Sequence, residues 1–345
     1  MYLLCIIFAF ANTWLLQNVR ATFLQTKILL LIASTPLALQ AMLRGDLGSD
    51  TLGYRNYFAY RAEYGPFEFL DNDIYGFEIG FDLLTRIFIL LNFNFELYQA
   101  GLALIISILI IEFFRKKTKH YAECFFLVIC MFIFFSFYNV QRQCLAIVVF
   151  YYGLSRDNIS SKYITIMLSC LIHYALIPIS ILYVLYSNNR YLKLNDLFLA
   201  VLFIAGFSVI FIVFSELLSN TTFSGYLSKT GIFNIGLNPG LGSFATLAYS
   251  ILCGWLIWQY SSKNSFTRFA SFSWILIYFL FSSNPFILRF GLTLQFGMVA
   301  LVAILFAGPV RKSKFIDKLI LYNSSLFLFG VYLINNTSEI LFINE

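Results

Sequence analysis

The chain has 345 residues, of which 60% are hydrophobic and only 12% are charged. A soluble domain carries about 25% charged residues, so a water-soluble fold of this size is excluded and lipid must be the solvent. Within lipid the backbone must satisfy its own polar groups, and the long apolar runs indicate that it does so in helices. We therefore predict an all-α, polytopic integral membrane protein.

The formal net charge of +6 does not indicate a nucleic-acid partner, because Lys and Arg gather in short clusters between apolar runs. Residues 115–119 and 311–314 form the clearest clusters, and such clusters are typical of cytoplasmic loops. The six cysteines lie in apolar stretches without a C-x-x-C pair, which predicts neither a metal site nor a disulfide framework. No cofactor is predicted.

A membrane-spanning helix needs about 20 apolar residues. In chain order, the sequence predicts such segments at 2–17, 28–43, 97–114, 122–138, 140–155, 163–186, 196–218, 242–260, 269–282, 287–307 and 319–335. Residues 79–93 form a shorter apolar stretch that Asp82 and Arg86 interrupt, so we interpret it as re-entrant or interfacial. The prediction is about 11–12 membrane segments in a single transmembrane domain, residues 1–345.

Two longer polar segments are predicted to lie on the outer side, because the basic clusters assign the other loops to the cytoplasm. The first, about 44–78, contains seven of the chain's 17 acidic residues, and three glycines near its start predict a tightly folded loop rather than a helix. The second is 219–241. This orientation requires the segment 163–190 to return to the side that it left, with a break near Pro178.

The polar sequence Asn139-Val140-Gln141-Arg142-Gln143 separates two wholly apolar runs. An arginine deep in a bilayer costs about 2.5 kcal/mol or more, so Arg142 should face a polar cavity or an anionic partner. The alternative is an exposed hairpin turn among lipid headgroups. Arg289, near the outer start of another span, could reach the interface or bind phosphate with Arg142, because guanidinium groups bind phosphate oxygens bidentately.

His173 is one of only two histidines and lies in an apolar segment. An imidazole side chain can transfer a proton or bind phosphate. The alternative is that a neighbouring helix satisfies the hydrogen bonds of this histidine. Glu78 borders the stretch at 79–93 and is a candidate acid or base. Either residue would give a membrane-embedded site its proton chemistry.

The start of the acidic segment carries side chains suited to sugars, namely Arg44, Asp46, Asp50 and Tyr54. Carboxylates accept hydrogen bonds from hydroxyl groups, and aromatic rings cover the apolar face of a sugar. The alternative is a solvated loop. The sequence lacks the motifs of ATP hydrolysis, zinc peptidases and serine hydrolases, so an enzyme here must use an activated substrate carried by the membrane.

These residues together resemble the EpsG-like and Wzy-type polysaccharide polymerases of bacterial envelopes, in order and approximate spacing across residues 44–290. The matching positions are Arg44 with Asp50 and Tyr54, Glu78 with Gly80, Asn139 with Arg142, Gln143 and Ala146, then His173, and finally Arg289. After His173 the sequence reads Tyr-Ala-Leu where the family has x-Ser-Ala, so only the histidine carries over.

The resemblance implies a polymerase of O-antigen, capsule or exopolysaccharide at the outer face of the bacterial inner membrane. Its substrate would be an undecaprenyl-diphosphate-linked oligosaccharide, and a chain-length regulator would be a candidate partner. The growing glycan would move onto an incoming lipid-linked unit, without a nucleotide or a metal. The expected catalytic residues are Arg142, His173, Arg289 and Glu78, and the expected substrate-binding residues are Arg44, Asp46, Asp50, Tyr54, Asn139 and Gln143.

Three other functions remain open at this stage. An O-antigen ligase, or another lipid-linked glycosyltransferase, would use the same donor with a different acceptor. A lipid-linked oligosaccharide flippase is a transporter, and transporters often contain internal repeats; the sequence has no second copy of the Arg142 or His173 segment. A membrane acyltransferase would use His173 as its base.

Overall fold

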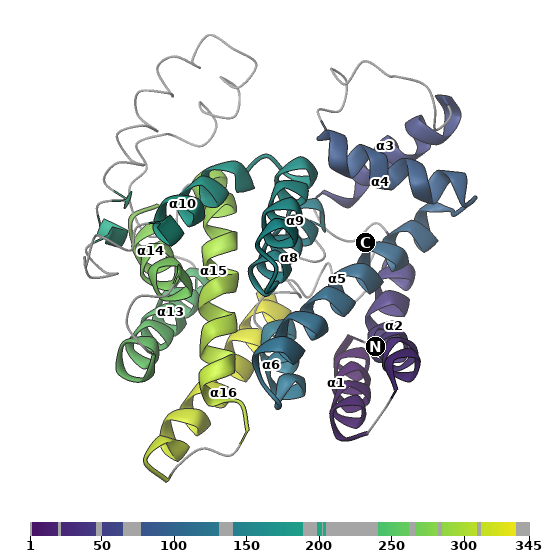
Figure 1. Cartoon of the computed structure of the whole chain (residues 1–345). Coiled ribbons are helices and arrows are strands. Elements are labelled where there is room, and N and C mark those ends of the chain that lie inside the picture. The colour runs from purple at the N-terminus through teal and green to yellow at the C-terminus, as the bar shows by residue number, and fades with distance from the viewer. Residues whose placement is uncertain are drawn as a thin grey trace. The chain divides into compact units, whose positions relative to one another are not determined.

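The computed structural model describes residues 2–19, 22–45, 50–64, 77–130, 141–188, 199–201, 203–204, 241–261, 266–281, 285–308 and 312–335. Within these residues the secondary structure is helical and contains no strand, which confirms the all-α prediction (Figure 1). The helices are α1 (Tyr2–Asn18), α2 (Phe23–Leu43), α3 (Thr51–Tyr64), α4 (Ile79–Leu90), α5 (Phe95–Lys117), α6 (Tyr121–Val128), α8 (Gln141–Leu154), α9 (Ile159–Ile172), α10 (Leu176–Asn188), α13 (Leu241–Tyr260), α14 (Phe266–Phe281), α15 (Pro285–Phe306) and α16 (Lys312–Asn335).

Two compact units make up the chain. The first contains residues 1–180 with the short segment 307–309, and the second contains residues 181–306 and 310–335. The division bears on packing alone, so the single transmembrane domain stays a prediction. The first unit contains most of the candidate site residues.

In the first unit, α5 is the central helix: α2 and α8 pack along it, α1 packs on α2, and α9 forms a hairpin with α8. Asn94 caps α5 by accepting a hydrogen bond from the Leu97 N–H, and basic residues complete its last turn. Both ends therefore carry the groups that a helix dipole favours. The fully buried side chains of Ile106, Ile110 and Phe114 form part of the core around α5.

The second unit, described separately, consists mainly of α13, α14, α15 and α16. Helices α14 and α15 pack closely, and α13 contacts α14, α15 and α16. Gly291 in α15 permits this packing, because an added Cβ would lie 2.8 Å or less from the Trp274 ring. The Trp274 indole N–H donates to the Ser250 hydroxyl at 3.1 Å, so the buried ring also has its polar group satisfied.

Two described helices are long and apolar enough to cross a membrane, Leu24–Leu43 within α2 and Phe95–Lys117. Large apolar side chains on other helices are exposed, including Ile164 at 60% and Phe327 at 64%. Such exposure is consistent with lipid as the surrounding solvent, and the features together are those of a membrane protein. The number of spans stays a prediction.

Helix α4 has 12 residues and a length of about 18 Å. The hydrocarbon core of a bilayer is about 30 Å thick, so α4 is too short to cross it alone. This agrees with the interpretation of 79–93 as a segment that does not fully span.

One prediction about the acidic segment is wrong. Residues from Thr51 onward form α3 rather than a loop, and Gly53 lies within this helix. An added Cβ at Gly53 would meet nothing within 4 Å, so close packing does not require glycine at this position. The residues after it, Tyr54 to Tyr64, suit a helix buried on one side, with Tyr57, Phe58 and Arg61 facing inward.

The predicted span 163–186 consists of two helices, α9 and α10. The break occurs at 173–175, close to the predicted position near Pro178. Helix α9 ends there because His173 adopts an extended backbone with φ −153° and ψ 113°. Pro178 itself lies in the first turn of α10, where a helix needs no N–H donor. The predicted span 196–218 and the outer loop 219–241 lie almost entirely outside the described residues.

Candidate functional site

Three of the predicted catalytic residues meet in the first unit. Glu78 immediately precedes α4, Arg142 lies at the start of α8, and His173 ends α9. The Glu78 carboxylate lies 2.7 Å from a guanidinium nitrogen of Arg142 and 2.7 Å from Nδ1 of His173. The Tyr174 N–H also donates to Glu78 at 3.3 Å. One carboxylate therefore joins two groups that lie far apart in the sequence.

The backbone around His173 fixes its ring next to Glu78. The His173 N–H donates to the Ser169 carbonyl, and its own carbonyl accepts from the Leu176 N–H at 3.0 Å. The residue is thus held between the end of α9 and the start of α10. Gly80 allows the close approach of α4, because a Cβ there would lie 2.7 Å from the Leu171 carbonyl.

Arg142 rests on an aromatic surface. Its guanidinium carbon lies 4.7 Å from the centre of the Phe77 ring, a geometry that attracts a cation. Tyr54 stacks on Phe77 at 5.7 Å, and its hydroxyl accepts from the Arg142 backbone N–H at 3.4 Å. Tyr54, predicted to contact a sugar, therefore adjoins Arg142. The sequence analysis did not single out Phe77.

The side chains of Glu78, Arg142 and His173 differ in solvent exposure. The side chain of Glu78 is 7% exposed, whereas those of Arg142 and His173 are 20% and 16% exposed. Arg142 and His173 are therefore the members that a substrate can reach, with Glu78 behind them. Burial alone would raise the pKa of Glu78, but the hydrogen bond with His173 and the charge of Arg142 outweigh burial and lower it, so the carboxylate is ionised.

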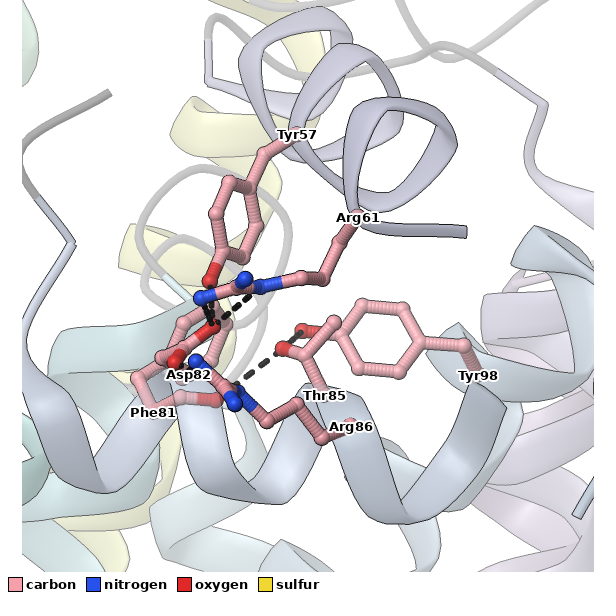
Figure 2. A network of polar contacts seen from close by, with 7 residues as sticks. All are labelled: Tyr57, Arg61, Phe81, Asp82, Thr85, Arg86 and Tyr98. Carbon is pink, nitrogen blue, oxygen red and sulfur yellow. Dashed lines mark hydrogen bonds and ion pairs between the residues drawn. The ribbon is translucent and has the colours of Figure 1, made fainter. Parts of the chain in front are cut away.

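A second charged cluster lies one turn further along α4 (Figure 2). Asp82 accepts from Arg61 of α3 at 2.7 Å and from Arg86 at 2.8 Å, and the Tyr57 hydroxyl also donates to it. The side chains of Arg61 and Asp82 are 1% and 5% exposed. Burial and the hydrogen bond to Asp82 raise the pKa of Tyr57, which keeps the phenol protonated as a donor.

Sequence reasoning noted Asp82 and Arg86 only as interruptions of an apolar stretch. Their spacing of four residues was the available signal, because two opposite charges at that spacing on a helix face each other. The partner on α3 could not be inferred, since α3 itself was not predicted. The cluster ties α3 to α4 close to the site around Glu78.

The remaining predicted residues have different settings. The Arg44 side chain is buried at the end of α2, where its Nε donates to Gln99 at 3.2 Å. The Asp50 carbonyl accepts from the Tyr54 N–H at the start of α3, and Gln143 is buried in α8. Asp46 and Asn139 lie outside the described residues, and Arg289 is a helical residue of α15 in the second unit. Their predicted roles stay predictions.

The described part of the chain contains no group of three or more His, Cys, Asp or Glu side chains placed to hold a metal ion. What the site around Glu78 offers is a cation, an imidazole and a carboxylate in direct contact. Such a set can bind an anion through the guanidinium and move a proton through the imidazole.

Comparison with known proteins matches the chain to a protein family. No curated protein and no solved structure is detectably similar to the chain. The family model described as the EpsG family matches residues 27–344, which is most of the chain and includes the site residues from Arg44 to Arg289. The resemblance inferred from the motifs is thereby confirmed, and the chain belongs to the EpsG family.

Proposed function

We propose that this protein polymerises lipid-linked oligosaccharide repeat units into a bacterial surface or secreted polysaccharide. Family membership supports a polysaccharide polymerase-type role. The observation that carries the proposal is the contact of Glu78 with both Arg142 and His173, because it combines an anion-binding group with a candidate base. The proposed location is the outer face of the inner membrane.

His173 is the proposed general base. Its Nδ1 faces Glu78 at 2.7 Å, so Nε2 is the ring nitrogen that can accept a proton from the acceptor sugar hydroxyl. The ionised Glu78 then holds the ring in place and stabilises the imidazolium that forms, as a carboxylate does behind a catalytic histidine in other enzymes. Glu78 is in this scheme a positioning residue for His173.

Arg142 is the proposed diphosphate ligand. One of its guanidinium nitrogens faces Glu78, but a guanidinium carries five N–H donors in total, and the remaining ones can bind phosphate oxygens. The Phe77 ring and Glu78 fix the plane of the guanidinium. A group held in advance in this way stabilises the negative charge that grows on the leaving group.

The proposed step forms one bond and breaks another. The acceptor hydroxyl oxygen bonds to the anomeric carbon of the growing glycan, and the bond between that carbon and the phosphate oxygen breaks. The hydroxyl proton moves to His173, and the undecaprenyl diphosphate leaves with the bonding electron pair. Tyr54 with Asp50 would contact the glycan, and the role of Arg289 as a diphosphate ligand stays a prediction from the sequence.

An O-antigen ligase is the second candidate, because the same residues could activate the same donor. The test is deletion of the gene in its host, followed by complementation with the wild type or with Arg142→Ala, His173→Ala or Glu78→Gln. Surface glycans are then separated on a gel. Arg55→Ala is a matched control, because Arg55 lies on α3, is about one-third exposed and pairs with Glu96 at 3.3 Å.

If the protein is a polymerase, the deletion strain should carry only single capped repeat units. The wild type and Arg55→Ala should restore a ladder of longer glycans. His173→Ala should reduce polymerisation about 100-fold or more, the usual contribution of a general base, at equal protein levels. If long chains persist without the gene and no second polymerase replaces it, the assignment is wrong. Complete loss of surface glycan in the deletion would instead favour the ligase or a flippase.

A further inference from the structure

The end of α5 and the turn between α8 and α9 bring two cations onto one aromatic ring. Nζ of Lys116 lies 5.3 Å from the centre of the Tyr152 ring, and Cζ of Arg156 lies 4.7 Å from the same centre. The two charges are therefore within about 10 Å of each other, roughly one Debye length, and they repel. The ring attracts both cations but has no charge that could neutralise them.

The acidic side chains near this pair do not balance its charge. Glu112, one turn before Lys116, already contacts Lys27 at 3.0 Å and Arg115 at 2.8 Å. Asp157 is the single acidic residue of the turn 155–158. Three more basic residues follow in the same two segments, Lys117, Lys119 and Lys162. The excess positive charge favours an anionic ligand.

Arg156 also has an unused hydrogen-bond donor. Its Nε is shielded from solvent and has no hydrogen-bond partner within the described residues, which is costly for a polar group. The residue lies just before the N-terminus of α9, where the Asn158 side chain accepts from the Ser161 N–H at 3.0 Å. Backbone N–H groups at such a terminus favour a bound anion. Charge and hydrogen bonding thus point to the same kind of ligand.

The surroundings favour a lipid over a free anion. Ile159 and Ile164 at the start of α9 are 69% and 60% exposed, and Tyr163 is 39% exposed. These side chains offer an apolar surface to acyl chains in the helix that follows Arg156 in the chain. The sequence also predicts that residues 115–119 lie at the cytoplasmic surface, where anionic headgroups attract Lys and Arg.

We propose that Lys116 and Arg156, held by Tyr152, bind the phosphate of an anionic phospholipid headgroup. The guanidinium and the ammonium group share the phosphate oxygens, which relieves their mutual repulsion. The acyl chains lie along the exposed face of α9. This site is independent of the proposed glycosyl transfer, because it uses none of the residues around Glu78.

The test uses the purified full-length protein in detergent, with phosphatidylglycerol or phosphatidylcholine added. Native mass spectrometry measures the retained lipid, and thermal unfolding measures stabilisation. The wild type should retain phosphatidylglycerol preferentially and unfold at a higher temperature with it. Each charge removed should weaken this binding about fivefold, so the double variant Lys116→Ala with Arg156→Gln should lose most of it. Lys119→Ala is the matched control and should weaken binding less than Lys116→Ala or Arg156→Gln does.

Three outcomes would overturn the proposal. The double variant retains phosphatidylglycerol as well as the wild type does, Lys119→Ala weakens binding equally, or inorganic phosphate stabilises the wild type as much as the lipid does. Without lipid, the double variant should unfold close to the wild-type temperature, because the lost cation–π contacts and the relieved repulsion oppose each other. This last measurement separates lost binding from misfolding.

Discussion

Replacing Gly80 with alanine puts a methyl group where α4 meets the end of α9. The new Cβ would lie 2.7 Å from the carbonyl carbon and oxygen of Leu171 and 2.9 Å from the Ile172 nitrogen. These are backbone atoms, so they cannot rotate away as the tip of a side chain could. Ordinary contact begins at 3.4 Å, so the two helices must separate by about 0.7 Å.

That separation acts on the contact between Glu78 and His173, which lie next to the crowded atoms. Adding about 0.7 Å to their 2.7 Å distance gives about 3.4 Å, beyond the normal range of an N–H···O hydrogen bond. Losing a hydrogen bond to a charged group costs about 1.5–3 kcal/mol. Alanine normally stabilises a helix by about 1 kcal/mol relative to glycine. A destabilised Gly80→Ala variant would therefore indicate the steric clash, and a stabilised one would indicate helix propensity alone.

We therefore expect Gly80→Ala to lower the unfolding temperature and to abolish the glycan ladder in the complementation assay. Gly53→Ala is the control, because it makes the same exchange in a helix where the Cβ meets nothing within 4 Å. It should keep the ladder and unfold at or above the wild-type temperature. If Gly80→Ala behaves like Gly53→Ala in both measurements, the close approach of α4 and α9 does not hold the site together.

Two further predictions concern charge. Asp82→Asn removes the carboxylate that the buried Arg61 contacts at 2.6 Å and should lower the free energy of unfolding by about 3 kcal/mol, measured with a denaturant. The control, Arg55→Gln, breaks an exposed pair with Glu96 and should lower it by less than about 1 kcal/mol. Equal losses would contradict a buried Asp82 that is coupled to Arg61. Because the pKa of Glu78 is lowered below its usual 4.5, its ionised form stabilises the fold above that pH, and this stability is lost as the pH falls through the lowered pKa. The difference in unfolding temperature between the wild type and Glu78→Gln should therefore be largest above pH 4.5 and shrink at lower pH, and a difference that grows instead would refute the assignment.

The helices that the sequence predicted best are those where apolar length alone decides the structure. The predicted span 97–114 lies within α5, Phe95–Lys117, and 242–260 differs from α13, Leu241–Tyr260, by one residue. The ends differ at α5 because its last turn is basic and stays helical while its side chains reach the interface. Helix α3 was not predicted, because the polar residues between its inward-facing side chains interrupt the apolar pattern in the sequence.

The site could be predicted residue by residue but not as an arrangement. Glu78, Arg142 and His173 each stood out as a polar group beside apolar runs, since burying charge in lipid is expensive. Their contact depends on the α8–α9 hairpin and on the approach of α4, which sequence periodicity does not specify. Arg44 was predicted to bind substrate as part of the acidic segment; its side chain is buried at the end of α2 and contacts Gln99, and its role stays a prediction.

Helix α4 explains why charged residues can gather here at all. Its two carboxylates lie one turn apart: Glu78 contacts Arg142, and Asp82 contacts Arg61 and Arg86. The buried Arg61 and the partly buried Arg86 and Arg142 thereby each contact a carboxylate, and without one the burial of Arg61 would be costly. Among these five described side chains, two carboxylates face three guanidinium groups, which leaves one positive charge in excess. Such an excess of positive charge would favour the anionic diphosphate that the proposed function requires.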